Sequence, residues 1–241
     1  MLTKTQAIVL RSLKYGDRRL IVDLLTERAG RIGTLVNIPK TIHGRHRKQL
    51  YQPMTILDIE TDLRPQAQLQ RIRDVRIAIP YATIPVDPYK LSTTLFLAEF
   101  LLHATRGEQE NAALFRYIVT SMQWFDTATR PTPNFHLAFI IHLAQFIGIA
   151  PNLDDYQRGH CFDLRNAVFS STTPLHADFL PADEAAQLRL LARMRYETMH
   201  LFRLSHDQRN QILGHLLTYY RLHLPAFPEL RSLQVVREIF E

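Results

Sequence analysis

The residues of this 241-residue sequence that are best suited to chemistry are basic, and they gather near its beginning. Between residues 40 and 48 the chain carries four fixed positive charges and two histidines but no acidic residue. Five more basic residues flank two predicted turns before this run. Lys and Arg side chains clustered in loops contact the phosphates of nucleic acid, and the counterions that they release make the affinity salt-dependent. The sequence therefore predicts nine phosphate contacts: Lys14, Arg18, Arg19, Arg28, Arg31, Lys40, Arg45, Arg47 and Lys48.

The alternative for each of these basic residues is a solvated surface side chain that contributes little to binding. Tyr15 and Tyr51 lie next to the basic residues and are candidates for stacking on bases. Their alternative is a half-buried position at the end of a strand.

The charge of the chain is unevenly distributed. The first 80 residues hold 15 Lys or Arg against 7 Asp or Glu, whereas residues 81–241 hold 14 against 16. The excess behind the formal net charge of +6 therefore lies entirely in the first third of the chain. A basic module joined to a nearly neutral one indicates a polyanionic partner for the basic module, with improved solubility as the alternative.

Common catalytic and nucleotide-binding motifs are missing from the sequence. Gly30-x-x-Gly33 lacks the further glycine and the Lys-Ser/Thr of a phosphate-binding loop, and neither Gly-x-Ser-x-Gly nor His-Glu-x-x-His occurs. The two pairs of carboxylates, at 154–155 and 183–184, are sequence neighbours whose side chains do not face each other. We therefore predict that the protein is not an enzyme.

The chain has one cysteine, Cys161, which excludes an internal disulfide and a four-thiolate zinc site within the chain. Of the eleven histidines, His160 and His176 could gather with Cys161 and Asp163 in an irregular segment and hold a metal. Scattered histidines are more often core or surface residues, so we predict no metal and no cofactor, with this cluster as the open alternative.

The first 80 residues read as strands, because short runs rich in Ile, Val and Leu alternate with turn signals. The predicted strands are 5–13, 20–26, 34–38, 52–59 and 69–79. Five short strands at regular spacing are typical of a small barrel or sandwich, and an oligonucleotide-binding (OB) barrel has the size that fits best.

After Pro80 the apolar residues recur at helical spacing, and Asp87 and Ser205 are expected to cap helices. The predicted helices cover 89–105, 111–127, 133–149, a stretch from 181, 205–224 and a stretch from 228, with 151–180 irregular. The predicted fold class is α+β, with a five-stranded OB-fold barrel for nucleic-acid binding over residues 1–80 and an α-helical domain over 81–241.

The longest apolar run, about 137–150, is shorter than the roughly 20 residues that a membrane-spanning helix needs. The first residues also lack the basic-then-apolar pattern of a signal peptide. Together with the single cysteine, these features lead us to expect a cytoplasmic protein.

Residues 5–32 run from one predicted strand through a turn to a second strand, which ends in Thr26-Glu27 before Gly30-Arg31. This segment resembles the opening of the bacterial RecO family of DNA-repair proteins, in which a second strand ends in Thr-Glu before a Gly-Arg or Gly-Lys. A basic loop then precedes a Gln-Pro, matched here by Gln52-Pro53. Residues 146–154 resemble the family's Leu-Gly-aromatic-x-Pro-x-Leu segment, and residues 229–237 resemble its C-terminal helix. The resemblance spans the chain in order.

What the resemblance implies is a recombination mediator with an OB-fold domain followed by a helical domain, acting at the bacterial nucleoid. Members of this family bind single- and double-stranded DNA and anneal complementary strands. They act with RecR and with the C-terminal tail of single-stranded-DNA-binding protein (SSB) to load RecA recombinase onto coated DNA. None of these activities requires a catalytic centre.

The chain departs from the family in one respect. Many members carry two Cys-x-x-Cys pairs that form a zinc module after the Pro-x-Leu segment, whereas here Tyr156 and Gly159 stand about where the first pair would fall. The resemblance therefore implies that zinc has been lost from this chain. The segment would instead be held by packing of Phe162, Leu164, Val168 and Phe169.

Two other classes of function remain. A protein-interaction adaptor would dock partner peptides on the helical domain, where an acidic tail would need an apolar pocket beside a residue such as Arg193, Arg195 or Arg203. A nuclease or other hydrolase is disfavoured because the sequence arranges no carboxylate or histidine pair.

Overall fold

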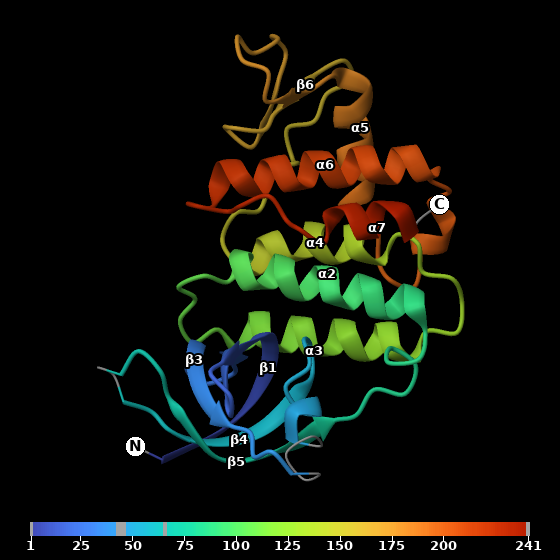
Figure 1. Cartoon of the computed structure of the whole chain (residues 1–241). Coiled ribbons are helices and arrows are strands. Elements are labelled where there is room, and N and C mark those ends of the chain that lie inside the picture. Colours follow the sequence, from blue (N-terminus) through green and yellow to red (C-terminus); the bar gives the residue numbers. More distant parts are fainter. Residues whose placement is uncertain (1, 42–46, 65–66, 240–241) are drawn as a thin grey trace. The chain divides into compact units, whose positions relative to one another are not determined.

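The computed structural model describes residues 2–41, 47–64 and 67–239, and it divides into two compact units. The first unit runs from the N-terminus to Thr127 and includes Leu230–Ile239, and the second covers Ala128–Glu229. Figure 1 shows the strands of the first unit in blue to cyan and the helices in green to red. Among the described residues, none of the helices combines the length and apolar character needed to cross a bilayer.

The first unit is built on one antiparallel sheet with the strand order β3-β2-β1-β4-β5. Its strands are β1 (Leu2–Tyr15), β2 (Arg19–Thr26), β3 (Gly30–Asn37), β4 (Ile56–Asp62) and β5 (Arg71–Ile79). The predicted α+β class with an N-terminal five-stranded OB fold is confirmed.

The predicted barrel is only partly closed. Edge strand β3 meets the start of β5 at a single parallel bridge between Thr34 and Gln70. There Leu35 N donates to Gln70 O at 3.0 Å, and Gln70 N donates to Gly33 O at 2.8 Å. Among the described residues no ladder continues this bridge along the two edges. The sheet therefore curves back on itself but leaves an open seam between its edge strands β3 and β5.

A bulge in β1 decides which side chains face the core of the barrel. The pairing of β1 with β2 shifts between Val9 and Arg11, after which Ser12 pairs with Val22 and Lys14 pairs with Leu20. Residues that pair directly across an antiparallel ladder project from the same face. Because Val22 and Leu20 belong to the buried core, Ser12 and Lys14 lie on the core face of the sheet.

The predicted strand at 52–59 begins four residues later, at Ile56. Met54 has a positive φ of 65° and donates its N–H to Val9 O at 2.6 Å, so the chain makes a turn there before it joins the sheet. Tyr51 and Met54 are 1% and 0% exposed, which shows that this turn packs into the core.

The long helices described in the first unit are α2 (Pro88–Ala104) and α3 (Ala112–Thr127), and the short helix α7 (Leu233–Ile239) also belongs to it, as does a helical turn at residues 47–49. The predicted cap is confirmed, because the Asp87 carboxylate accepts from Tyr89 N and Lys90 N at the start of α2. Helix α2 packs against β1 and α7. It is buried at most positions, although Leu91 and Leu95 are 40% and 43% exposed.

Helices α2 and α3 thus belong to the same compact unit as the sheet, although the chain changes from strands to helices near Pro80. The boundary between a domain at 1–80 and one at 81–241 stays a prediction.

The second unit contains α4 (Phe135–Phe146), α5 (Ala182–Leu191), the short 3-10 helix η1 (Met199–Leu201) and α6 (His206–His223). Ser205 caps α6 as predicted, in a reciprocal pair with Gln208. The segment predicted to be irregular holds a small sheet of order β7-β6-β8, formed by β6 (Cys161–Asp163), β7 (Val168–Ser170) and β8 (Phe179–Leu180).

Aromatic packing holds this small sheet. The ring of Phe169 lies 5.0 Å from that of Phe162 and 5.2 Å from that of Tyr156, in both cases edge to face. Phe162, Leu164 and Phe169 are buried, as predicted, but Val168 is 36% exposed. Val168 was expected to join the packing and does not, because it lies on the opposite face of β7 from Phe169.

Candidate nucleic-acid interface

Four of the nine predicted phosphate contacts surround a hollow at the open end of the barrel. This barrel-mouth hollow has a volume of about 440 Å³, and its cationic rim consists of Lys14, Arg18, Arg19 and Lys48. The exposed side chains of these residues come from the end of β1, the β1–β2 turn, the start of β2 and the segment after residue 46. The fold therefore brings together charges that lie 34 residues apart in the chain, from Lys14 to Lys48.

The floor of the barrel-mouth hollow is apolar. Leu20 and Tyr51 line it and belong to the buried core, and Ile38 lines it and packs against that core. The position of Tyr51 is fixed by a hydrogen bond from Ser12 Oγ to Tyr51 O at 2.6 Å. Burial raises the pKa of Tyr51, and the nearby Arg47 guanidinium opposes this shift.

The β1–β2 turn presents the rim. Gly16 takes a positive φ of 65°, which lets the chain reverse between Tyr15 and Arg19. Asp17 in this turn lies 3.4 Å from Lys40 Nζ, and both side chains are largely exposed, at 82% and 63%. One carboxylate thus accompanies the cations of the rim, which remains positive on balance.

Two predicted contacts lie elsewhere. Arg28 follows the far end of β2 and lines a separate hollow of about 390 Å³ that carries charges of both signs. Arg31 is only 15% exposed at its side chain, which lies 3.4 Å from Asp23 and donates to Leu102 O at 2.9 Å. Burial lowers the pKa of Arg31, although Asp23 opposes the shift. Arg31 therefore joins the sheet to the end of α2 and is not available to a phosphate.

Arg45 lies outside the described residues, so the structure places eight of the nine predicted contacts. Of these, Lys14, Arg18, Arg19 and Lys48 line one hollow. Lys40 forms an ion pair with Asp17, which also lines that hollow. The role of this set in binding DNA stays a prediction.

The two tyrosines differ. Tyr51 is 1% exposed, so the expectation that it stacks on bases is wrong, because its ring is part of the core. Tyr15 is 54% exposed and pairs with Arg19. Because side chains alternate along a strand, Tyr15 projects from the opposite face to Lys14.

Sequence reasoning overlooked a second row of basic residues, on edge strand β5. Arg71, Arg73 and Arg76 are exposed along this strand. Arg73 lies 3.5 Å from Asp62, and Arg76 lies 3.1 Å from Asp58. Three arginines within one predicted strand were the available signal, but the carboxylates of β4 partly neutralise them.

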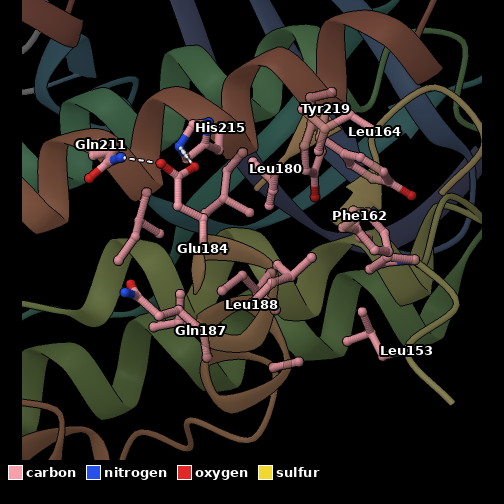
Figure 2. Close-up of a pocket in the computed structure, with 18 residues that line it drawn as sticks. Leu153, Phe162, Leu164, Leu180, Glu184, Gln187, Leu188, Gln211, His215 and Tyr219 are labelled. Atoms are coloured by element: carbon pink, nitrogen blue, oxygen red, sulfur yellow. Dashed lines mark hydrogen bonds and ion pairs between the residues drawn. The ribbon is translucent and has the colours of Figure 1, made fainter. Parts of the chain in front are cut away.

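The second unit contains an apolar pocket between α5, α6 and the small sheet (Figure 2). Its volume is about 50 Å³, and side chains such as Leu153, Phe162 and Leu188 line it. At one edge Glu184 lies 2.8 Å from His215 Nε2 and accepts from Gln211 Nε2 at 2.7 Å, as Figure 2 shows. None of the described lining residues is Lys or Arg, so the predicted Arg193, Arg195 and Arg203 do not line this pocket.

The possible metal ligands described in the segment at 151–180 are not arranged as a zinc site. Cys161 Sγ donates to the carbonyl oxygens of Ser170 and Thr172, each at 3.3 Å, and is buried. Asp163 lies 3.5 Å from His176; burial raises the pKa of Asp163, but hydrogen bonds led by Asn166 lower it below its usual value. In the part of the chain that the structure describes, no three His, Cys, Asp or Glu residues are placed to hold a metal. That the protein carries no zinc stays a prediction.

Comparison with known proteins covers nearly the whole chain. Residues 1–81 match the family model described as "Recombination protein O N terminal", and residues 85–234 match "Recombination protein O C terminal". The chain is 46% identical over 240 residues to the DNA repair protein RecO of Phocaeicola vulgatus, and 46% identical over 242 residues to that of Bacteroides fragilis. It is 30% identical over 248 residues to the RecO protein of Porphyromonas gingivalis. Each alignment covers 100% of both chains.

Proposed function

The chain belongs to the RecO family of DNA repair proteins, and from this premise we propose that it is a DNA-binding recombination mediator that anneals complementary single strands. The observation that carries the proposal is the barrel-mouth hollow. There Lys14, Arg18, Arg19 and Lys48 converge on one end of an OB fold.

The proposed mechanism is electrostatic. Two DNA strands repel each other through their phosphates, and each phosphate bound by Lys or Arg releases condensed counterions. A cationic surface that holds one strand lowers the repulsion felt by a second strand. Base pairing between the strands then supplies the sequence specificity, so the protein needs to read only the backbone.

No covalent step is part of this mechanism, and we propose that the protein acts without catalysis. Its buried carboxylates support this view because they serve the fold. For example, Asp126 accepts backbone hydrogen bonds from the segment before α2.

We further propose that the protein acts with RecR and SSB to load RecA recombinase onto SSB-coated single-stranded DNA. The apolar lining of the pocket in the second unit supports an SSB contact. Its volume of about 50 Å³ is well below the roughly 150 Å³ that holds a benzene-sized group, so the pocket would have to widen to admit the apolar end of a peptide tail. Arg189 and Arg193 are exposed and adjoin the lining residues Leu188 and Ala192, so they could pair with acidic residues of such a tail.

The test of DNA binding is fluorescence anisotropy with labelled single-stranded DNA over a series of salt concentrations. The wild-type affinity should fall steeply with salt. The triple variant Arg18→Ala, Arg19→Ala, Lys48→Ala should bind more weakly and flatten the slope by about 2, since each single-strand phosphate contact contributes roughly 0.7.

The matched control carries Arg193→Ala, Arg195→Ala and Arg203→Ala, which removes the same charge from exposed positions of the second unit. Its salt slope should equal that of the wild type. Equal slopes for both triple variants would show that the barrel mouth does not hold the DNA.

The alternative function is a non-catalytic adaptor that docks partner peptides through the second unit. An adaptor would bind an SSB-tail peptide and bind no DNA even at low salt. The same anisotropy assay, with a labelled tail peptide in place of DNA, distinguishes the two.

A further inference from the structure

Helix α6 forms a firmly held wall of the apolar pocket in the second unit. The hydroxyl groups of Tyr219 and Tyr220 donate to Ile149 O at 2.6 Å and to Ile140 O at 2.8 Å. Both tyrosines line the pocket, and they are only 5% and 1% exposed. Because these bonds tie α6 to α4 and to the residues just after α4, movement of this wall would leave buried polar groups without partners.

Helix α5 forms a weakly held wall of the same pocket. Of its ten residues, only Ala185 and Leu191 are buried, and the helix packs against β6 and β8. Leu188 lines the pocket between these two positions and is half-buried. Elements with few buried apolar residues open at a low cost in free energy. If one wall of the pocket moves, we therefore expect it to be α5.

Glu184, in the first turn of α5, joins α5 to α6 at the edge of the pocket. Its carboxylate accepts from Gln211 Nε2 at 2.7 Å, and its Oε2 lies 2.8 Å from His215 Nε2 (Figure 2). We call these two contacts the α5–α6 latch. All three residues line the pocket, so the latch holds the two walls together where the pocket is polar.

The closed latch leaves two polar atoms poorly satisfied. Glu184 Oε2 and His215 Nε2 are shielded from solvent, yet neither forms a well-aligned hydrogen bond to any described residue. Buried polar atoms without such a bond raise the free energy of the folded state. Separation of α5 from α6 would admit water to both atoms, which offsets part of the cost of opening the latch.

Charges beside the pocket act in opposite directions on an acidic peptide. Arg189 and Arg193 are exposed and adjoin the lining residues Leu188 and Ala192, so they attract it. The carboxylate of Glu184 lines the pocket itself and repels it. Glu184 therefore opposes docking in two ways, because it holds the movable wall in place and carries the same charge as the peptide.

We infer that Glu184 controls access to this pocket: an acidic peptide with an apolar end docks when the α5–α6 latch opens and α5 moves away from α6. The inference rests on the proposed function, because it names how the proposed SSB contact is regulated. The closed pocket, at about 50 Å³, is too small for an aromatic side chain, which needs roughly the 150 Å³ that holds benzene.

The first test is fluorescence anisotropy of full-length protein with a labelled peptide of five aspartates ending in phenylalanine. Glu184→Ala removes both latch contacts and should tighten peptide binding about tenfold, the size of a hydrogen bond to a charged group. Asp183→Ala is the matched control, since Asp183 is an exposed carboxylate of the same helical turn and is not among the described lining residues. It should tighten binding by no more than about threefold, the effect of an exposed charge.

A second pair of variants separates the latch from charge repulsion. Gln211→Ala removes one latch contact without changing the net charge, and it should tighten peptide binding about threefold. Gln187→Ala is its control, because Gln187 also lines the pocket but takes no part in the latch; it should leave the affinity unchanged. Equal affinities of these two variants would show that Glu184 acts through its charge alone, and would overturn the latch.

Hydrogen exchange followed by mass spectrometry tests the movement of α5 without any peptide. The amides of residues 182–191 should exchange about tenfold faster in Glu184→Ala than in the wild type, and those of α6 should not change. Asp183→Ala should exchange like the wild type over both helices. Faster exchange confined to α5, together with tighter peptide binding, cannot result from misfolding. Unchanged exchange of α5 in Glu184→Ala would overturn the inference.

The inference and the proposed function fail in different ways. If neither the wild type nor Glu184→Ala binds the peptide, the proposed SSB contact is wrong, and the control of docking by Glu184 is wrong with it. If the wild type binds the peptide but Glu184→Ala binds it no more tightly than Asp183→Ala does, the latch is wrong and the proposed contact stands.

Discussion

Asp126 should be one of the most sensitive positions for the stability of the first unit. It lies in α3, is 5% exposed, and holds the segment that leads from the sheet into α2. Asp126 Oδ1 accepts from Thr83 N and Ile84 N, and Oδ2 accepts from Ala82 N, each at 2.8 Å. The substitution Asp126→Ala would remove both acceptor oxygens and with them all three backbone hydrogen bonds.

A buried cation adds to the effect. Lys90 is 6% exposed and donates to Thr83 Oγ1 at 2.8 Å and to Asp126 O at 3.0 Å, while Thr83 Oγ1 also donates to Asp126. Without the carboxylate, this network loses its negative charge.

A buried donor left without an acceptor costs about 1–3 kcal/mol, and breaking a buried charged network costs about 3–5 kcal/mol. Because water can enter the space left by the side chain, the three N–H groups do not each incur the full penalty. We expect Asp126→Ala to lower the free energy of unfolding by about 3–5 kcal/mol.

Asp126→Asn should have a smaller effect. Its amide oxygen can still accept from Thr83 N and Ile84 N, but its NH₂ group faces the N–H of Ala82. One lost acceptor predicts a decrease of about 1–3 kcal/mol.

The pH dependence has a defined sign. Burial raises the pKa of Asp126, but the hydrogen bonds from Ala82, Ile84 and Thr83 outweigh it and lower the pKa below its ordinary value of 3.8. A carboxylate whose pKa is lower in the folded state contributes stability above its unfolded pKa and loses it as the pH falls through the folded value. The difference between wild type and Asp126→Ala should thus be constant near neutral pH and shrink below pH 3.8.

Urea denaturation of the full chain at pH 7, followed by circular dichroism, measures these differences. Asp154→Ala is the control, since Asp154 is exposed and a surface change of this kind is usually within about 0.5 kcal/mol. A loss below about 1 kcal/mol for Asp126→Ala would refute the reasoning, because the network would then add little beyond one ordinary hydrogen bond.

Three further predictions concern the fold. Gly30→Ala should lower the free energy of unfolding by at least about 2 kcal/mol in the same assay, because Gly30 has a φ of 60° and a Cβ would lie 2.3 Å from Glu108 O. Gly16→Ala is the control, since Gly16 has a φ of 65° but a Cβ there would meet nothing within 4 Å. The control should lose less stability. Arg31→Ala should lower the free energy of unfolding by about 1–2 kcal/mol, because the hydrogen bond to Leu102 O is lost. Arg28→Ala should change the free energy of unfolding by less than about 0.5 kcal/mol. Equal effects of the two substitutions would contradict the structural role of Arg31. Purified protein should contain far less than one equivalent of zinc by mass spectrometry, and a chelator should leave its melting temperature unchanged; stoichiometric zinc would show that Cys161 and its neighbours are ligands after all.

The candidate site was only partly predictable from the sequence. The type and charge of Lys14, Arg18, Arg19 and Lys48 mark them as phosphate contacts wherever they lie. Their convergence on one hollow depends on pairing between β1 and β2 and on a segment that returns more than 30 residues later. Arg31 shows the reverse case, since its sequence context is that of a turn residue but its side chain packs against the end of α2.

The segment at 151–180 shows a similar division. The lone Cys161 already excludes a four-thiolate zinc module within the chain. What holds the segment instead is a three-stranded sheet with edge-to-face contacts at Phe169, and strands of two or three residues leave no periodic pattern to read.

Features that depend on near neighbours in the chain could be predicted from the sequence alone. Alternation and helical spacing placed the strands and helices, and Asp87 and Ser205 marked two helix starts, because a cap bonds to groups two or three residues away. The charge distribution identified the basic module, because charges can be counted along the chain without knowing the tertiary structure. Only the folded chain reveals the bulge that turns Lys14 onto the core face, the bridge between Thr34 and Gln70, and the partners of Asp126. Those features join residues far apart in the chain, and their free energy exists only once distant segments have packed together.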